Sequence, residues 1–364
     1  MAITAQDFQN IELAIAAYVD EAYTEEKRIT TSGIVTTDDR IDVSKESYIG
    51  QLRAYNPISA NINTPSLTNA ADGAFSDIST HVSTFIKSAR SVGFDQVNLQ
   101  ELISQQDGFE KVARDMAELK AQDRQKAVMG VLRGVAAAEA AVGSQGINSF
   151  NDGVDPANGF YVDLNADGEF GAAAANAGEG RKLVDSSISG AAAGERLFRS
   201  VGMAYQDYED DYFYLITSPE MLADFRGANL VDEDPIEDGN LMFQTIYGGK
   251  FRLLLSRTNQ GDRGGDTNVN EFSKKTTLIV REGAISFTDI EAPNPVELDR
   301  NASSYLGGGN TEMWHRWSHV VHPAGYDWSG ATNRFPEYSD YEAAASWNRT
   351  SDVLNLGILP IFHS

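Results

Sequence analysis

The stretch "GFEKVARDMAELKAQDRQKAVMGVLRGVAAAEAAV", residues 108–142, carries the most sustained regular pattern in the sequence. No proline interrupts about ten turns of chain at ~3.6 residues per turn. Apolar side chains at helical spacing form one stripe at Val112, Met116 and Leu119, and a second group follows at Val128, Val131, Leu132 and Val135. This spacing predicts one long helix, with a break near Gly130 and Gly134 as the alternative. Each glycine costs a helix roughly 1 kcal/mol unless another backbone packs closely there.

The sequence before this helix is different in kind. Residues 6–22 have apolar side chains at helical spacing and predict a short amphipathic helix. Residues 30–73 are rich in Thr, Ser and Asn and are broken by Pro57 and Pro65. They hold too little apolar material for a core of their own, so we interpret them as a long extended arm or hairpin.

The sequence after the helix alternates between loops and strands. Residues 144–195 are loop-heavy, and "DYFYLIT" at 211–217 predicts a strand. A helix should follow, because Ser218 can cap it, Pro219 fits its first turn, and Gly227 can end it. Further strands are expected at 250–258, 276–287 and 314–323.

Composition sets the class of protein. The chain has 364 residues, 41% of them hydrophobic, which suffices for a core and favours two lobes or one domain with long excursions. Fifty-three acidic residues against 29 basic ones give a net charge of −24, which argues against non-specific binding to nucleic acid or membrane. Cysteine is absent, which excludes disulfides and thiolate chemistry. No apolar run approaches the ~20 residues of a membrane helix, and no signal peptide is evident. The sequence predicts a soluble protein made in a cytoplasm.

One acidic turn resembles the start of a calcium loop. In "YVDLNADGEFG", residues 161–171, the side chains of Asp163, Asn165 and Asp167 alternate, and the carbonyl of Glu169 would add a fourth oxygen. The twelfth position, which needs a bidentate carboxylate, is Ala174. An Asx-rich surface turn without an ion explains the same residues and is the favoured interpretation.

Other candidate chemistry is weaker. His315, His319 and His322 fall within eight residues, but on a strand the third points away from the first two. The glycine-rich stretches at 190–194, 248–250 and 307–309 lack the spacing of a phosphate loop. Carboxylate pairs at 208–211 and 231–238 are expected by chance in an acidic chain. The residues therefore predict no active site, and we expect a protein that is not an enzyme.

A set of sequence segments, taken in order along the chain, resembles the major capsid proteins of tailed bacteriophages. Within the chain, from about residue 6 to the end, the phrases run "RQKAVMGVLRGV", "ANGFYVDLN", "DYFYLITSPEMLADFRGANLVD", "FQTIYGGKFRLLLSRT", "LIVREGAISF", "NPVELDR", "WHRWSHVVHPAGYDW" and "SWNRTSDVLNLGILPIF". The His322-Pro323-x-Gly325 turn followed by an aromatic pair is the most distinctive of them.

The resemblance implies an α+β fold of the Hong Kong 97 type, with a long spine helix and a mixed axial domain. Residues 1–40 would be an N-terminal arm and 41–90 an extended loop region. Residues 91–143 would carry the spine helix of a peripheral domain, 144–290 would form the axial domain, and 291–364 would return to the peripheral domain.

The resemblance also implies a function. Copies of the chain would form hexamers and pentamers of an icosahedral shell around double-stranded phage DNA, in a virion assembled in the host cytoplasm. A portal protein is an implied partner, with a cement or decoration protein as a further candidate. The resemblance begins close to Met1, so a separate scaffolding protein is expected. No cofactor is implied, although calcium at the Asp163 turn stays open. An encapsulin-like nanocompartment shell is the alternative, and a monomeric calcium-binding or hydrolytic protein is a third class.

Overall fold

In the computed structural model of the chain, the described residues are 32–38, 41, 49–55, 80–94, 108–142, 159–163, 201, 212–217, 219–227, 229–232, 236–238, 241–255, 275–290, 292, 294–301, 310–351 and 356–363. The helix expected at 6–22 lies outside them. No helix among these residues is long and apolar enough to cross a membrane.

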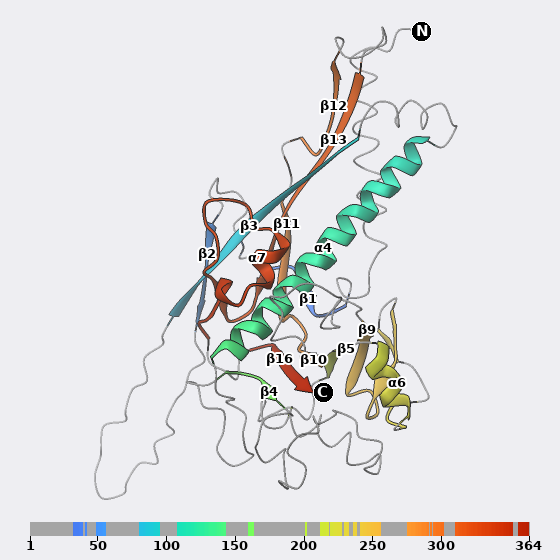
Figure 1. Ribbon diagram of the computed structural model, residues 1–364, viewed down its shortest axis with the longest axis vertical. Coiled ribbons are helices and arrows are strands. Elements are labelled where there is room, and N and C mark those ends of the chain that lie inside the picture. Colours follow the sequence, from blue (N-terminus) through green and yellow to red (C-terminus); the bar gives the residue numbers. More distant parts are fainter. Residues whose placement is uncertain are drawn as a thin grey trace, which may run out of the picture.

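Helix α4, Gly108–Ala141, runs through the middle of the molecule without interruption (Figure 1). The single long helix expected at 108–142 is confirmed, and the alternative of a break at the glycines is wrong. Both glycines face a close neighbour, formed by helix α7 (Tyr338–Glu342) and the 3-10 turn η3 (Ala344–Ser346). A Cβ atom at Gly130 would lie 3.1 Å from the Cβ of Tyr341, and one at Gly134 would overlap the Tyr341 carbonyl oxygen. The close backbone approach that would justify these glycines is therefore present.

A first sheet covers one flank of α4. Its strand order is β1 (Val35–Thr36), β11 (Ile285–Ile290), β13 (Asn310–Pro323), β3 (Thr80–Phe94) and β2 (Ile49–Tyr55), and β12 (Val296–Asn301) also pairs with β13. Strands β2 and β3 pair antiparallel from Ile49↔Ile86 to Tyr55↔Thr80. They are thus the two sides of a hairpin that residues 56–79 connect. The arm or hairpin expected at 30–73 contains β2, but its partner strand β3 begins at Thr80, beyond the expected range.

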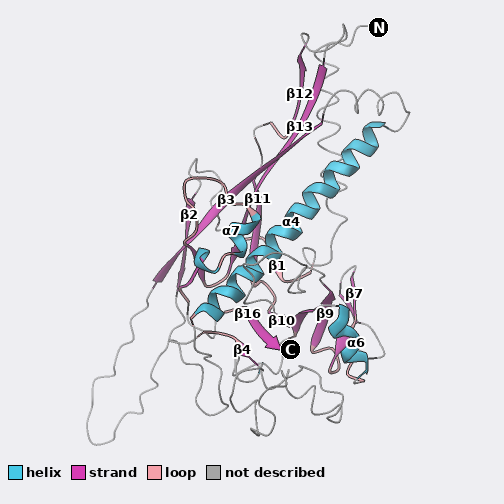
Figure 2. Ribbon diagram, in the orientation of Figure 1, coloured by secondary structure: helices cyan, strands magenta, loops and turns pink. Residues whose placement is uncertain are grey.

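A second sheet lies near the C-terminal end of α4 (Figure 1). Its order is β4 (Val162–Asp163), β16 (Ile358–His363), β10 (Lys275–Val280), β5 (Phe213–Thr217), β9 (Phe251–Leu255) and β8 (Thr245–Ile246). Helix α6 (Pro219–Gly227) follows β5, where the sequence predicts it. Two small pairs complete the described elements, β6 (Ile236–Asp238) with β7 (Leu241–Phe243) and β14 (Tyr326–Trp328) with β15 (Trp347–Arg349). The described part is an α+β structure dominated by strands (Figure 2).

The expected strand at 276–287 is two strands in two different sheets. β10 ends at Val280, and β11 begins at Ile285 in the first sheet. Gly283 between them has φ +68°, in the left-handed region that glycine adopts without a steric cost. This turn sends the chain from one sheet to the other, which a continuous apolar run does not reveal.

One core joins the helix and both sheets. It includes Val131 and Leu132 of α4, Ile285 of the first sheet and Leu278 of the second. Residues 127–132 of α4 are all buried, so the helix is enclosed on every side at its middle. A smaller cluster, containing Phe85 and Val320, lies on the face of the first sheet that points away from α4.

Candidate functional site

Asp123 on α4 joins three separate parts of the fold. Its side chain is buried, with 4% exposed. Trp317 Nε1 on β13 donates a hydrogen bond to Oδ2 at 2.6 Å, and the Tyr338 hydroxyl donates to Oδ1. Arg90 on β3 pairs with Oδ1 at 3.4 Å. A carboxylate that accepts from several donors can be buried at a tolerable cost, and it then fixes the elements that carry those donors.

The contacts of Asp123, which we call the joint at Asp123, are extended by Arg90 to the loop before α7. Arg90 Nη2 donates to the Pro336 carbonyl at 2.7 Å, and its guanidinium lies 5.2 Å from the centre of the Tyr338 ring. Strand β3, helix α4 and this loop are therefore held at one point. Because β3 is one side of the β2–β3 hairpin, the joint fixes the base of that hairpin relative to the helix.

Glu139 makes a second joint, near the end of α4. It is 2% exposed, and its Oε2 accepts from the Phe160 backbone N–H at 2.6 Å and from Arg349 Nη1 at 3.0 Å. Phe160 lies just before β4 of the second sheet, and Arg349 ends β15. The two carboxylates are sixteen positions apart, about 24 Å along the helix at 1.5 Å per residue. At about 100° per residue they point to different sides of it. The helix is thus fixed to the first sheet by the ion pair of Asp123 with Arg90 and to the β14–β15 pair by the ion pair of Glu139 with Arg349, and the Phe160 N–H bond adds a contact beside β4 of the second sheet.

Sequence reasoning did not find Asp123 or Glu139, although a signal exists. Asp123 stands seven positions after Met116 on the same helical stripe, and Glu139 continues the stripe of Val128, Leu132 and Val135. An acidic residue at a position of the apolar stripe is either exposed to solvent, where the stripe is interrupted, or buried together with a partner for its charge. The partners Arg90 and Arg349 lie far away in sequence, so the pattern alone cannot name them.

The three histidines of β13 do not converge. His319 faces α4, where its Nδ1 is 3.7 Å from Asp123 Oδ2 and its ring stacks on Phe287. His322 points to the opposite face, with its ring edge toward Phe85. His315 is buried beside Trp317. The strand alternation in the sequence predicts this division, with His315 and His319 on one face and His322 on the other. Within the described part of the chain, Nε2 of His319 and Nδ1 of His322 have no hydrogen-bond partner.

Burial sets the protonation of these rings. It lowers the pKa of His319 from 6.5 to about 4, and the nearby Asp123 carboxylate only partly opposes this effect. Burial likewise lowers the pKa of His322 to about 4. Tyr338 shifts upward: burial and its hydrogen bond to Asp123 raise its pKa to about 12. At neutral pH both histidines are uncharged and Tyr338 keeps its proton, so the joint at Asp123 carries one carboxylate and one guanidinium.

The calcium-like turn lies almost wholly outside the described residues. Asp163 ends β4, opposite Phe362 of β16, and Asn165, Asp167 and Glu169 fall beyond the described range. Among the residues that are described, no three His, Asp or Glu side chains form a group that could hold a metal ion. The glycine stretches at 190–194 and 307–309 are also outside that range.

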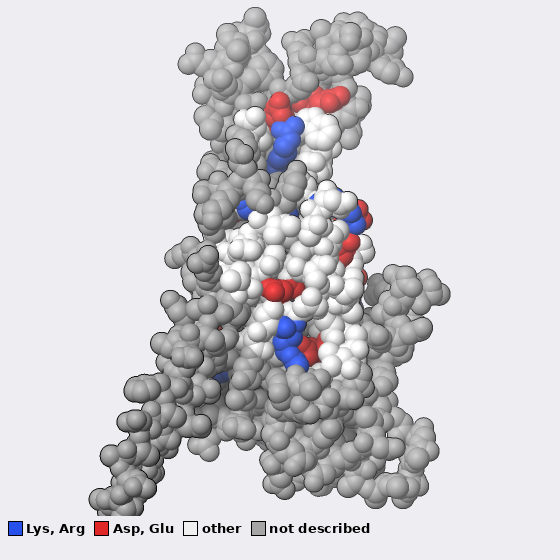
Figure 3. All heavy atoms as spheres, turned by 90° about the vertical axis from the view of Figure 1, so that its left-hand side faces the viewer, with Lys and Arg blue, Asp and Glu red and all other residues white. Residues whose placement is uncertain are grey.

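Several opposite charges on the described surface form ion pairs. In the face of Figure 3, Lys and Arg atoms lie beside Asp and Glu atoms at several places. Arg316 on β13 pairs with Glu297 on β12, and Arg133 on α4 pairs with Glu342 on α7 at 3.0 Å. The pairing contrasts with the net charge of −24 for the whole chain.

The sequence matches no protein-family model and no curated protein. Solved structures do resemble the fold. The capsid of Ralstonia phage GP4 aligns with a TM-score of 0.50 and 11% identity over 92% of this chain and 89% of that one. Mycobacterium phage Che8 aligns at 0.46 with 10% identity over 92% and 91%, and the capsid of cyanophage P-SCSP1u at 0.44 with 12% identity over 90% and 85%. The likeness to the Ralstonia phage capsid spans nearly all of both chains, and it shows that this chain has the α+β fold of a phage capsid protein.

Proposed function

We propose that the chain is a major capsid protein of a tailed bacteriophage, which assembles with copies of itself into the shell that encloses the phage DNA. The observation that carries this proposal is the fold likeness to the Ralstonia phage GP4 capsid across nearly the whole of both chains. The proposed assembly is an icosahedral shell of hexamers and pentamers with the Hong Kong 97 type of fold, and no catalysis is proposed.

The contacts that Asp123 and Glu139 make around α4 support a structural role. A shell subunit contacts neighbouring copies on several sides, and the same contacts recur around every ring of copies. Its shape must therefore be the same in every copy. Two buried carboxylates and a core that runs across both sheets supply such rigidity. Many modest contacts between rigid copies then give a durable particle.

The parts of the chain are assigned as follows in this proposal. Helix α4 is the spine, and residues 1–40 and 41–90 form the arm and the extended loop, with the β2–β3 hairpin as the base of the loop. The second sheet belongs to the axial unit. In this proposal residues 91–143 carry the spine of the peripheral domain, 144–290 form the axial domain, and 291–364 return to the peripheral domain. A portal protein, a separate scaffolding protein and a cement protein are the proposed partners.

Expression of the full chain tests the proposal. Size-exclusion chromatography and negative-stain microscopy should show capsomers or closed particles, with or without a co-expressed scaffolding protein. Material that elutes near 39.6 kDa under every condition and forms no particles would contradict it.

A further inference from the structure

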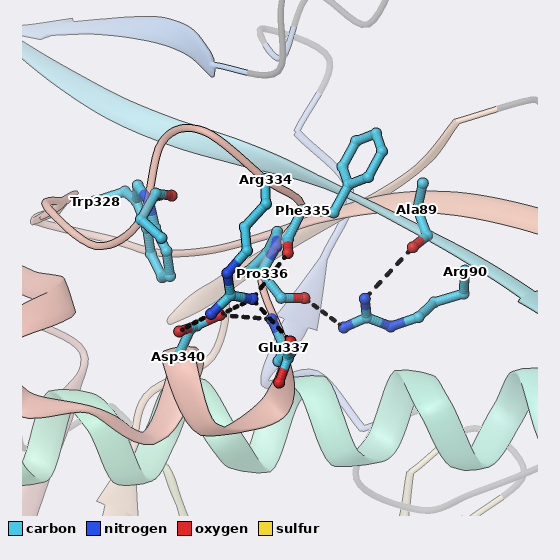
Figure 4. Close-up of polar contacts among 9 residues, drawn as sticks. Ala89, Arg90, Trp328, Arg334, Phe335, Pro336, Glu337 and Asp340 are labelled. Atoms are coloured by element: carbon cyan, nitrogen blue, oxygen red, sulfur yellow. Dashed lines mark hydrogen bonds and ion pairs between the residues drawn. The ribbon is translucent and has the colours of Figure 1, made fainter.

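The loop that leads into α7, residues 329–337, is held at both ends by polar contacts. At its start Ser329 Oγ donates to the Ala345 carbonyl at 2.6 Å, and Trp328 Nε1 donates to the Ala331 carbonyl at 3.2 Å. At its end Arg90 donates to the Pro336 carbonyl (Figure 4). The loop is therefore fixed to β3 at one end and to η3 at the other.

Arg334 fixes the middle of the loop. Its guanidinium binds Glu337 Oε1 at 3.1 Å and Asp340 Oδ2 at 2.9 Å, and it also reaches the Phe335 carbonyl. Glu337 and Asp340 bind each other's backbone N–H in a capping box at the start of α7. A loop with this many internal contacts loses little further freedom when a partner covers it.

This ordered loop presents an aromatic side chain at the surface. Phe335 is 38% exposed, whereas the next residue, Pro336, is buried. In Figure 4 the Phe335 ring points away from the polar contacts that hold its backbone. A rigidly held aromatic ring, surrounded by polar groups that already have partners, is the usual form of an anchor in a protein interface.

Among the described residues that contact the loop or Tyr338, the charges cancel. In that part of the chain the contacting ionic side chains are three cations and three anions: Arg90, Lys126, Arg334, Asp123, Glu337 and Asp340. Two chains that each carry −24 repel each other over most approaches. A neutral region with an apolar centre is where such copies can meet at the lowest electrostatic cost, and the same region offers no net charge to attract a strongly charged partner.

We propose that Phe335 is an anchor of the contact between one copy of the chain and the next in the assembled particle. The proposal rests on the proposed function and adds the surface that carries out part of it. The partner is a second copy of this chain, whose apolar surface covers the Phe335 ring while Arg334, Glu337 and Asp340 form the polar rim.

Substitution gives the first test, on the full chain. With Phe335→Ser we expect the protein concentration for half-assembly to rise at least about tenfold, and with Phe335→Leu we expect a smaller rise. Leu119→Ser is the matched control, since Leu119 is 39% exposed on α4, and it should assemble like the unmodified chain. Circular dichroism and thermal melting of the unassembled variants check that each one folds. Equal assembly of Phe335→Ser and the unmodified chain, or an equal loss with Leu119→Ser, would overturn the proposal.

A thiol probe tests the contact with the anchor intact. Because the chain has no cysteine, Thr332→Cys in the loop and Ala223→Cys on α6 each carry a single reactive thiol at an exposed position. Alkylation of Thr332→Cys should slow at least about tenfold in particles relative to disassembled chain, and that of Ala223→Cys should slow less. Equal slowing at both sites, no slowing at Thr332→Cys, or slowing that needs a different added protein refutes the contact between copies. If the unmodified chain forms particles, these results test only the contact at Phe335. If the unmodified chain never forms particles, both the proposed function and the contact at Phe335 are wrong.

Discussion

The carbonyl oxygen of Tyr341 occupies the space where a Cβ atom at Gly134 would stand, so helix α4 and the α7–η3 segment touch backbone to backbone. Trp347 Nε1 donates a hydrogen bond of 2.8 Å to the same oxygen. The missing side chain at Gly134 thus lets the Tyr341 carbonyl, which accepts from Trp347, lie directly against the helix backbone. This contact explains why a residue that weakens an isolated helix stands in the middle of the longest helix described.

Gly134→Ala should destabilise the chain. The added methyl group displaces the Tyr341 carbonyl and strains its bond from Trp347, an overpacking cost of about 1–3 kcal/mol, which outweighs the roughly 1 kcal/mol gained in helix propensity. Gly130→Ala is the control, because the nearest atom to its Cβ would be the Tyr341 Cβ at 3.1 Å and its other neighbours would lie at ordinary contact distances of 3.6 Å or more, so its net effect should be close to zero. Urea unfolding of the unassembled chain measures both. Similar midpoints for the two variants would show that the backbone contact at Gly134 is unimportant.

Asp123→Ala should cost more than any exposed carboxylate on the same helix. The change leaves Arg90, Trp317 and Tyr338 without their shared acceptor, and loss of one partner from a buried ion pair costs about 3–5 kcal/mol. Asp115→Ala removes an exposed carboxylate from α4 and should change the unfolding free energy by less than about 0.5 kcal/mol. Equal effects in urea unfolding would mean that Asp123 does not join the helix to the sheet.

The elements with strong local patterns were predictable from sequence. Helix α4 has an uninterrupted stripe, and the Ser-Pro-Glu start and Gly227 end of α6 are local signals. Strand β3 was missed because its sequence, "THVSTFIKSARSVGF", is mostly polar and is held by its neighbours β2 and β13 instead of by its own hydrophobicity. The joints at Asp123 and Glu139 could not be predicted, because their partners come from elements as much as 210 positions away.

Acid should destabilise the chain through its buried histidines. The folded-state pKa values of His319 and His322, about 4, lie below the ordinary 6.5, so between these values the unfolded chain binds more protons than the folded one. Stability therefore falls as pH drops from 6.5 toward 4, by on the order of 2 kcal/mol per histidine at pH 5. Around His319 the facing charges are Asp123, Arg90, Arg124 and Lys120, and for His322 the facing charge is Asp38.

Urea unfolding at pH 7, 6 and 5 measures this slope. The double variant His319→Gln with His322→Gln lacks both titrating groups and should show a flatter dependence than the unmodified chain. If the two proteins lose the same free energy over this range, the acid sensitivity comes from other groups.

Calcium at the Asp163 turn is a separate hypothesis. If Asp163, Asn165, Asp167 and the Glu169 carbonyl hold the ion, Asp163→Ala with Asp167→Ala should lower the melting temperature of particles only when calcium is present. The comparison is made in calcium and in chelator. An equal decrease in both conditions means that the turn has a structural role without an ion, which is the interpretation that its sequence favours.

Salt should promote assembly. Each copy carries −24, so bringing copies together raises their mutual repulsion. From 0.1 to 1 M NaCl the screening length shortens from about 10 to about 3 Å, which removes most of this repulsion but little of the attraction between apolar surfaces in contact. The protein concentration for half-assembly, followed by light scattering, should therefore fall with salt. Sucrose, which strengthens apolar burial without screening, separates the two effects. Assembly that weakens as NaCl rises would instead mean that ion pairs between copies dominate the contacts, and the neutral loop around Phe335 could not be their centre.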